Sequence, residues 1–128
     1  MLIRYRRGWR MSLGFAIALM AGMTIGVVVV QHKGIGDAEV QEKVVLDNER
    51  VQVMELVFPP GFRGEEHEAP DNELGYVLDG EFAVVTKGRG KRVVHRGEAV
   101  WAARGDVHYS LNESTTPARL LVVLLKER

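Results

Sequence analysis

Three side chains of this 128-residue chain have types and spacing that could hold a metal ion. His67 and Glu73 are six residues apart, so in an extended strand, where alternate side chains point to opposite faces, they would share one face. His108 could meet them from a facing strand. Two imidazoles and one carboxylate form the facial triad that suits Fe(II) and leaves coordination positions open for substrate or oxygen.

Other kinds of catalytic site lack their residues. The chain has no cysteine, which excludes disulfides, thiolate zinc sites and a cysteine nucleophile. It contains no GxSxG elbow, no phosphate-binding glycine loop and no Ser-His-Asp order, so neither nucleophilic catalysis nor a nucleotide cofactor is expected. Each candidate histidine taken alone could also be an ordinary core or rim residue. We interpret four acidic residues near His67 as a solvated loop face and place His95 outside the site; the four are Glu65, Glu66, Glu68 and Asp71.

The elements that would position these side chains are short valine-rich strands separated by turn residues. This pattern is typical of an all-β sandwich or barrel, and eight strands with short links suit a jelly roll. Pro59-Pro60-Gly61 ends one strand because proline cannot donate to a β-ladder. The predicted strands are 43–46, 50–58, 74–78, 82–87, 91–95, 99–102, 107–111 and 119–125.

Several residues of these strands are expected to line or support the site. Ser110 has the same parity as His108 and could line the cavity, whereas Tyr109 should face the outside of the barrel. We assign Tyr76, Phe82 and Trp101 to the core or to the wall of the pocket.

Two blocks of motif residues resemble the cupin superfamily. The first block runs from Gly61 through His67, Ala69 and Glu73 to Gly80, and the second comprises Gly97, Ala103, Gly105, His108 and Asn112. The family's first motif has a glycine, His-x-His, a glutamate and a glycine at these spacings. Its second motif has a glycine, Pro-x-Gly, a histidine and an asparagine. The resemblance covers residues 42–125 and implies a double-stranded β-helix, the cupin form of the jelly-roll barrel.

The chain departs from the family pattern at two positions. Ala69 stands where the family has its second histidine, and Ala103 stands where it usually has proline. The resemblance therefore implies three remaining metal ligands, His67, Glu73 and His108, and a divalent transition metal (Fe, Mn, Ni or Zn). The expected partner is a small-molecule ligand, which a metal-dependent, oxygenase-like enzyme would transform. Two alternatives remain: a non-enzymatic binding or sensing module, and an accessory protein that uses the barrel as an interaction surface.

The N-terminal segment predicts attachment to the cytoplasmic membrane. Residues 11–30 form twenty uncharged residues, the length that a helix needs to cross the hydrocarbon layer, and four arginines precede them. We expect an uncleaved, single-pass signal anchor at residues 1–30, a linker at 31–41 and the barrel domain at 42–128 on the extracytoplasmic, periplasmic side. The alternative is that the same segment is a cleaved signal peptide.

The charge of residues 31–128 and the last predicted strand indicate which macromolecular partners to expect. Residues 31–128 carry 13 basic and 17 acidic side chains, so a basic nucleic-acid footprint is absent and no nucleic-acid partner is expected. The apolar run Leu120–Leu125 predicts a strand that is covered on both faces. One face would be the barrel core, and the other would contact a second subunit in a homodimer.

Overall fold

A computed structural model describes residues 32–33 and 39–127 of the chain. The predicted membrane-spanning helix lies outside the described residues. Within the described part no helix has the length and apolar character needed to cross a membrane. All regular structure in this part is β-strand, as the sequence predicts.

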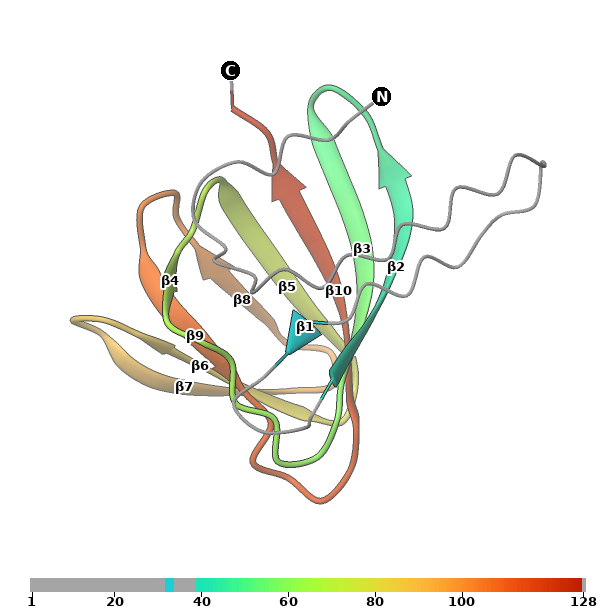
Figure 1. Ribbon diagram of the computed structural model, residues 1–128, viewed down its shortest axis with the longest axis vertical. Helices are drawn as coiled ribbons and strands as arrows, with labels where there is room; N and C mark the ends of the chain where they lie inside the picture. Colours follow the sequence, from blue (N-terminus) through green and yellow to red (C-terminus); the bar gives the residue numbers. More distant parts are fainter. Residues whose placement is uncertain (1–31, 34–38, 128) are drawn as a thin grey trace.

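The strands form two sheets that face each other across a common core (Figure 1). The larger sheet has the order β1-β2-β3-β10-β5-β8, and the smaller has the order β4-β9-β6-β7. The strand bounds are β1 His32–Lys33, β2 Glu39–Asp47, β3 Val51–Phe58, β4 His67–Glu68, β5 Asn72–Asp79, β6 Glu81–Thr86, β7 Gly90–His95, β8 Ala99–Ala102, β9 Val107–Leu111 and β10 Ala118–Leu125.

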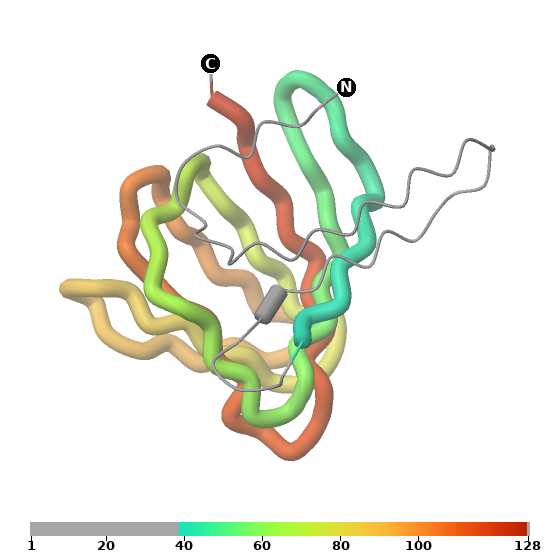
Figure 2. The backbone as a smooth tube through the Cα atoms, viewed as in Figure 1, coloured from blue at the N-terminus to red at the C-terminus, as the bar shows by residue number. Residues whose placement is uncertain are grey.

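The last strand occupies the middle of the larger sheet. β10 pairs antiparallel with β3 along one edge and with β5 along the other, so strands from both halves of the chain meet on it (Figure 2). Its inward side chains Leu120, Val122 and Leu124 are at most 4% exposed. Burial alternates along β3 as well, which is the two-residue period of a strand with one face on the core.

Most predicted strands agree with the structure, but the predicted extended stretch at residues 67–77 does not. Strands 99–102 and 107–111 are confirmed at both ends, whereas β2 begins at Glu39, within the predicted linker. Residues 67–77 do not form one extended face. Instead β4 ends at Glu68 and belongs to the smaller sheet, and β5 begins at Asn72 in the larger sheet. Pro70 lies between them and has no N–H to donate to a ladder.

The turn between β5 and β6 carries the chain from the larger sheet to the smaller. Gly80 occupies this turn with φ of 81°, in the left-handed region that favours glycine. A Cβ atom at this position would lie 2.4 Å from the carbonyl oxygen of Pro117 and 3.0 Å from Cα of Ala118. The turn therefore packs directly against the backbone that leads into β10.

The outer face of the larger sheet carries an unbroken apolar row. The paired positions are Leu46, Val53, Val123, Leu74 and Trp101, which lie side by side on five strands. Trp101 is 46% exposed, so its assignment to the core or pocket wall is wrong. Alternation along the strand explains the error, since the inward neighbour of Trp101 is Ala102. Tyr76 is likewise 40% exposed, whereas Phe82 is buried as expected.

Candidate functional site

The two motif histidines meet at one end of the smaller sheet. His67 of β4 and His108 of β9 are directly paired in register. Their Nε2 atoms are 3.1 Å apart, and their rings stand nearly perpendicular, with centroids 4.6 Å apart. His108 is buried, and His67 is half-buried beside it. The structure therefore brings these two sequence-predicted residues together.

A hydrogen bond to the backbone determines which ring nitrogen of His67 carries the proton and which one faces His108 as an acceptor. Nδ1 of His67 is 3.0 Å from the carbonyl oxygen of Glu65. A carbonyl can only accept, so Nδ1 carries the proton, and Nε2 of the neutral ring presents a lone pair toward His108. Nδ1 of His108 is buried without a hydrogen-bond partner.

Glu73 is the second residue of β5, on the facing sheet. Its Oε2 atom is shielded from solvent and has no hydrogen-bond partner. Because no cation compensates it, burial raises the pKa of the Glu73 carboxyl to about 7. Burial, and next the neighbouring His67, lower the pKa of His108 to about 4. At pH 6 the site is therefore expected to hold a protonated carboxyl and a neutral imidazole.

These two pKa shifts should cancel in the pH dependence of stability. Glu73 binds its proton more tightly in the folded state, so it lowers stability as the pH rises from about 4.5 to about 7. His108 binds its proton less tightly when folded, so it raises stability between about pH 4 and 6.5. We expect Glu73→Gln to expose the histidine contribution, a gain of up to about 3 kcal/mol from pH 4 to 6.5. Urea unfolding at several pH values would measure it.

The exposed pair of His95 and Glu98 supplies the control for this experiment. Substituting Glu98 by Gln should leave the pH profile of the unaltered protein in place, since both groups are largely solvated. An identical pH profile for Glu73→Gln and the unaltered protein would contradict the assignment.

The histidine pair fits two positions of a metal site. Zinc and similar ions bind imidazole nitrogen at about 2.0–2.1 Å, so two adjacent ligands lie roughly 3 Å apart. The observed separation of 3.1 Å matches this value. However, no group of three or more His, Cys, Asp or Glu side chains is close enough to hold a metal among residues 32–33 and 39–127. The two histidines are therefore placed as two ligands of one metal ion, whereas Glu73 is not close enough to count as a third ligand.

Ala69 offers no side-chain atom that could bind a metal beside the two histidines. Ala69 is 1% exposed, and its backbone N–H donates to the carbonyl of Asp106 while its carbonyl accepts from the N–H of Gly105. These two bonds tie the segment after β4 to the loop before β9. They hold His67 and His108 side by side through the backbone.

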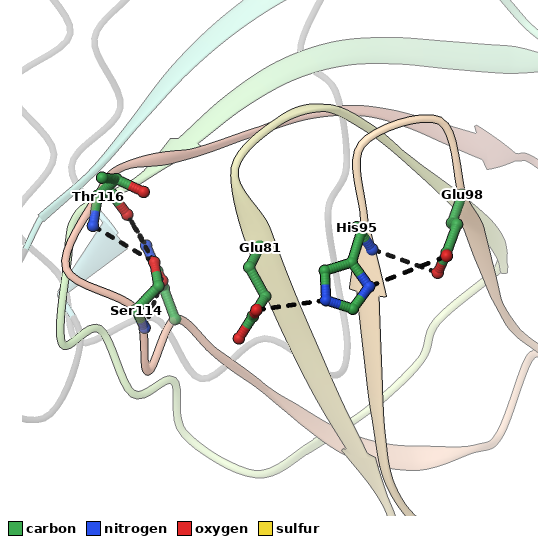
Figure 3. Close-up of polar contacts among 6 residues, drawn as sticks. Glu81, His95, Glu98, Ser114 and Thr116 are labelled. Carbon is green, nitrogen blue, oxygen red and sulfur yellow. Dashed lines mark hydrogen bonds and ion pairs between the residues drawn. The ribbon is translucent and has the colours of Figure 1, made fainter.

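His95, which the sequence places outside the site, lies at the far end of β7. Its Nε2 atom is 3.3 Å from Oε2 of Glu81, and its Nδ1 atom is 3.9 Å from Oε1 of Glu98 (Figure 3). All three side chains are more than 40% exposed. Such solvated pairs contribute little to stability. His95 is therefore an exposed histidine with which the effects of substituting His67 and His108 can be compared.

Asn112, the last residue of the second motif block, has a structural role. It is completely buried, and its Nδ2 atom donates to the carbonyls of Phe58 and Thr116. Its Oδ1 atom accepts from the backbone N–H and the hydroxyl of Ser114. The Ser114 hydroxyl also contacts the carbonyl oxygen of Thr116 (Figure 3). All hydrogen-bonding positions of the amide are thus used to close the loop before β10.

Gln52 of β3 is a buried polar residue that the sequence interpretation did not consider. It is 3% exposed, and its Oε1 atom has no hydrogen-bond partner. It lies in one cross-strand row with Leu124 and Glu73. The alternation of β3 could have revealed it, because Gln52 shares parity with Met54, Leu56 and Phe58.

Comparisons with known proteins agree with this architecture. Residues 54–124 match the family model described as the cupin domain. No curated protein matches the chain. The matched residues include the histidine pair, Glu73 and Asn112.

Solved structures with the same fold come from proteins of several kinds. TT1209 from Thermus thermophilus is 29% identical, with a TM-score of 0.63 over 70% of this chain and 85% of its own. The DMSP lyase DddQ from Ruegeria pomeroyi is 18% identical, with a TM-score of 0.63 over 69% of this chain and 47% of its own. The cupin domain of an XRE family transcriptional regulator from Enterobacter cloacae is 20% identical, with a TM-score of 0.60 over 70% and 98%. The last two similarities show the fold alone.

Proposed function

This chain belongs to the cupin domain family, and from that premise we propose that it is a metal-dependent enzyme acting on a small molecule. His67 and His108 would hold a divalent transition metal, and Glu73, which the sequence predicts as the third ligand, could join them only if its carboxylate moved toward the pair. The single observation that carries the proposal is the convergence of the two Nε2 atoms at 3.1 Å. Bound there, the metal would supply Lewis-acid or redox chemistry to a substrate in its open positions.

The protein residues around the pair have properties that support this role. His108 is kept neutral by burial, so its lone pair is available well below neutral pH. The hydrogen bond from His67 to the carbonyl of Glu65 orients the ring, as second-layer bonds do for metal-binding histidines. Glu73 offers a buried carboxyl that can release or take up a proton near neutral pH.

Metal content measured after anaerobic reconstitution tests the proposal. We expect about one Fe, Mn, Ni or Zn per chain in the unaltered protein. Either His67→Ala or His108→Ala should reduce the affinity at least about a hundredfold, because loss of a direct ligand exceeds the usual effect of losing a supporting bond. Glu73→Ala should also weaken binding.

The matched control is His95→Ala, which removes an exposed histidine from the same barrel. It should retain full metal content. Metal-free protein under all four conditions, or equal losses in His95→Ala and His108→Ala, would overturn the proposal.

A ligand-binding or sensing module is the second candidate function. One observation favours it: the described part of the chain holds no group of three side chains that could bind a metal. A metal-free barrel that binds a small molecule without transforming it would support this candidate.

We further propose that residues 11–30 anchor the barrel to the cytoplasmic membrane, with the domain on the periplasmic side. The twenty uncharged residues behind four arginines support this topology. Alkaline carbonate should fail to extract the full chain, and protease added to spheroplasts should digest the domain. Complete protection from protease would refute the orientation.

We also propose a homodimer through the apolar row on the larger sheet. A two-fold axis would place the row of one subunit on the same row of the other. Leu74→Glu or Trp101→Glu should shift the full chain to monomers in sedimentation experiments in mild detergent. Val93→Glu, at a 39% exposed apolar position of the smaller sheet, is the control. Monomers of the unaltered chain at high concentration would contradict the dimer.

A further inference from the structure

The strand that carries His67 has little pairing of its own. β4 has two residues, both paired with β9, and one of these pairs joins His67 to His108. A cross-strand pair of side chains contributes roughly 0.2–1 kcal/mol, so the ladder of a two-residue strand holds it weakly. The separation of the two histidine rings therefore depends on contacts outside β4.

Asp106, two residues before His108, supplies those contacts through its backbone. Its carbonyl accepts the N–H of Ala69, two residues after His67, at 2.8 Å, and the carbonyl of Ala69 accepts the N–H of Gly105 at 2.9 Å. The segment that follows one histidine and the segment that precedes the other are thus joined at one point. A shift of the Asp106 backbone would move the two rings relative to each other.

The side chain of Asp106 fixes the turn in which this carbonyl lies. Its Oδ2 atom accepts the N–H of Ala103 at 2.9 Å, and its backbone N–H donates to the carbonyl of Ala103 at 3.0 Å. These two bonds close the turn between β8 and β9 at both ends. The carboxylate therefore holds the Asp106 backbone in the position from which it binds Ala69.

Arg89 binds the same carboxylate from a third element. It lies in the turn between β6 and β7, where its N–H donates to the carbonyl of Thr86, the residue of β6 that pairs with His108. Its guanidinium forms an ion pair with Oδ2 of Asp106. A partly exposed pair contributes about 1 kcal/mol or less to stability, so we expect its effect in the orientation of Asp106.

We propose that Asp106 is a positioning residue for the histidine pair and that Arg89 holds its carboxylate in place. No third side chain among the described residues is close enough to the pair to bind a metal with it, so Asp106 acts through the backbone rather than as a ligand. This inference rests on the proposed function, because the separation of His67 and His108 matters for a metal that both rings bind. It assigns a role to two residues outside the three expected ligands.

Two measurements on the full chain in detergent test the proposal: the affinity for Zn(II), and the NOE between the two histidine rings in the metal-free protein. Asp106→Ala removes the carboxylate but keeps the backbone bond to Ala69. We expect it to bind zinc about tenfold more weakly and to lose most of the NOE. Asp106→Asn can still accept from Ala103 but cannot form the ion pair with Arg89, so its effect should be intermediate.

Variants of Arg89 supply the conservative rescue and the matched control. Arg89→Met should weaken zinc binding about threefold, and Arg89→Lys should restore it because an ammonium can still pair with the carboxylate. The control is Lys91→Met, which breaks the exposed ion pair of Lys91 with Glu113 on the same hairpin. It should leave the zinc affinity and the NOE unchanged.

Several outcomes overturn the proposal. These are an unaltered metal-free chain without the NOE, unchanged zinc affinity and NOE in Asp106→Ala, or equal losses in Arg89→Met and Lys91→Met. A lower melting temperature of Asp106→Ala with both readouts unchanged would show a purely structural role. If Asp106→Ala does not fold, Arg89→Met decides, because it leaves the turn bonds of Asp106 in place.

The NOE needs no metal, so it separates this proposal from the metal proposal. If the unaltered chain binds no zinc but the NOE depends on Asp106 and Arg89, the metal proposal fails and this one stands. If zinc binds through the two histidines but neither readout responds to these variants, only this one fails.

Discussion

Gly80→Ala is expected to destabilise the barrel by about 3–5 kcal/mol. A Cβ atom costs about 1–2 kcal/mol at the positive φ of this residue, and it would also lie 2.4 Å from the carbonyl oxygen of Pro117. Neither neighbour is a flexible side chain that could rotate away, because both contacts are with backbone atoms. The melting temperature should fall by at least about 15 °C, as measured by circular dichroism.

Gly88→Ala separates the two causes of this effect. Gly88 has nearly the same φ, 83°, but nothing lies within 4 Å of the Cβ atom that would be added. It should therefore lose only about 1–2 kcal/mol, the conformational part alone. Equal losses at the two glycines would show that close packing of the β5–β6 turn against Pro117 does not matter.

Asn112→Ala should cost about 3–5 kcal/mol, which is a large part of the stability of a domain of this size. The substitution removes four hydrogen bonds and leaves the carbonyl of buried Phe58 without its side-chain donor. Asn112→Asp should be about as damaging, because it places an acceptor against two carbonyl oxygens. Urea unfolding measures both.

Ser114→Ala is the graded control for the asparagine. It removes the 2.7 Å hydroxyl bond to Asn112 and the contacts of the hydroxyl with Thr116, but it keeps the backbone bond and both amide donations of Asn112. We expect a loss of about 1 kcal/mol. If Ser114→Ala lowered the free energy of unfolding as much as Asn112→Ala, the serine rather than the buried amide would be the source of the stabilisation.

The larger strands could be predicted from the sequence because each is a run of several strand-forming residues bounded by turn residues. β3 and β10 are identified by their runs of valine, leucine and other apolar residues, and burial alternates along both in the structure. β4 could not be found in this way, since two residues carry no period. Its place depends on pairing with β9, which is distant in the sequence.

The candidate site could be predicted only in part for the same reason. The motif spacing identified His67 and His108, and the structure pairs them. The grouping of Glu73 with them assumed a single extended strand through Pro70, where the chain instead crosses from one sheet to the other. The buried Gln52 was not predicted, because a buried glutamine belongs to no metal-binding or catalytic motif.

The central place of β10 has a consequence for how the protein is made. Residues 118–125 are synthesised after all other strands, yet β3 and β5 each depend on them for one complete edge of hydrogen bonds. A nascent chain lacking these residues would leave both edges open and the inward side of the larger sheet incomplete. The barrel should therefore fold only after translation of β10, and ribosome-bound intermediates should remain sensitive to protease until that strand has emerged from the exit tunnel.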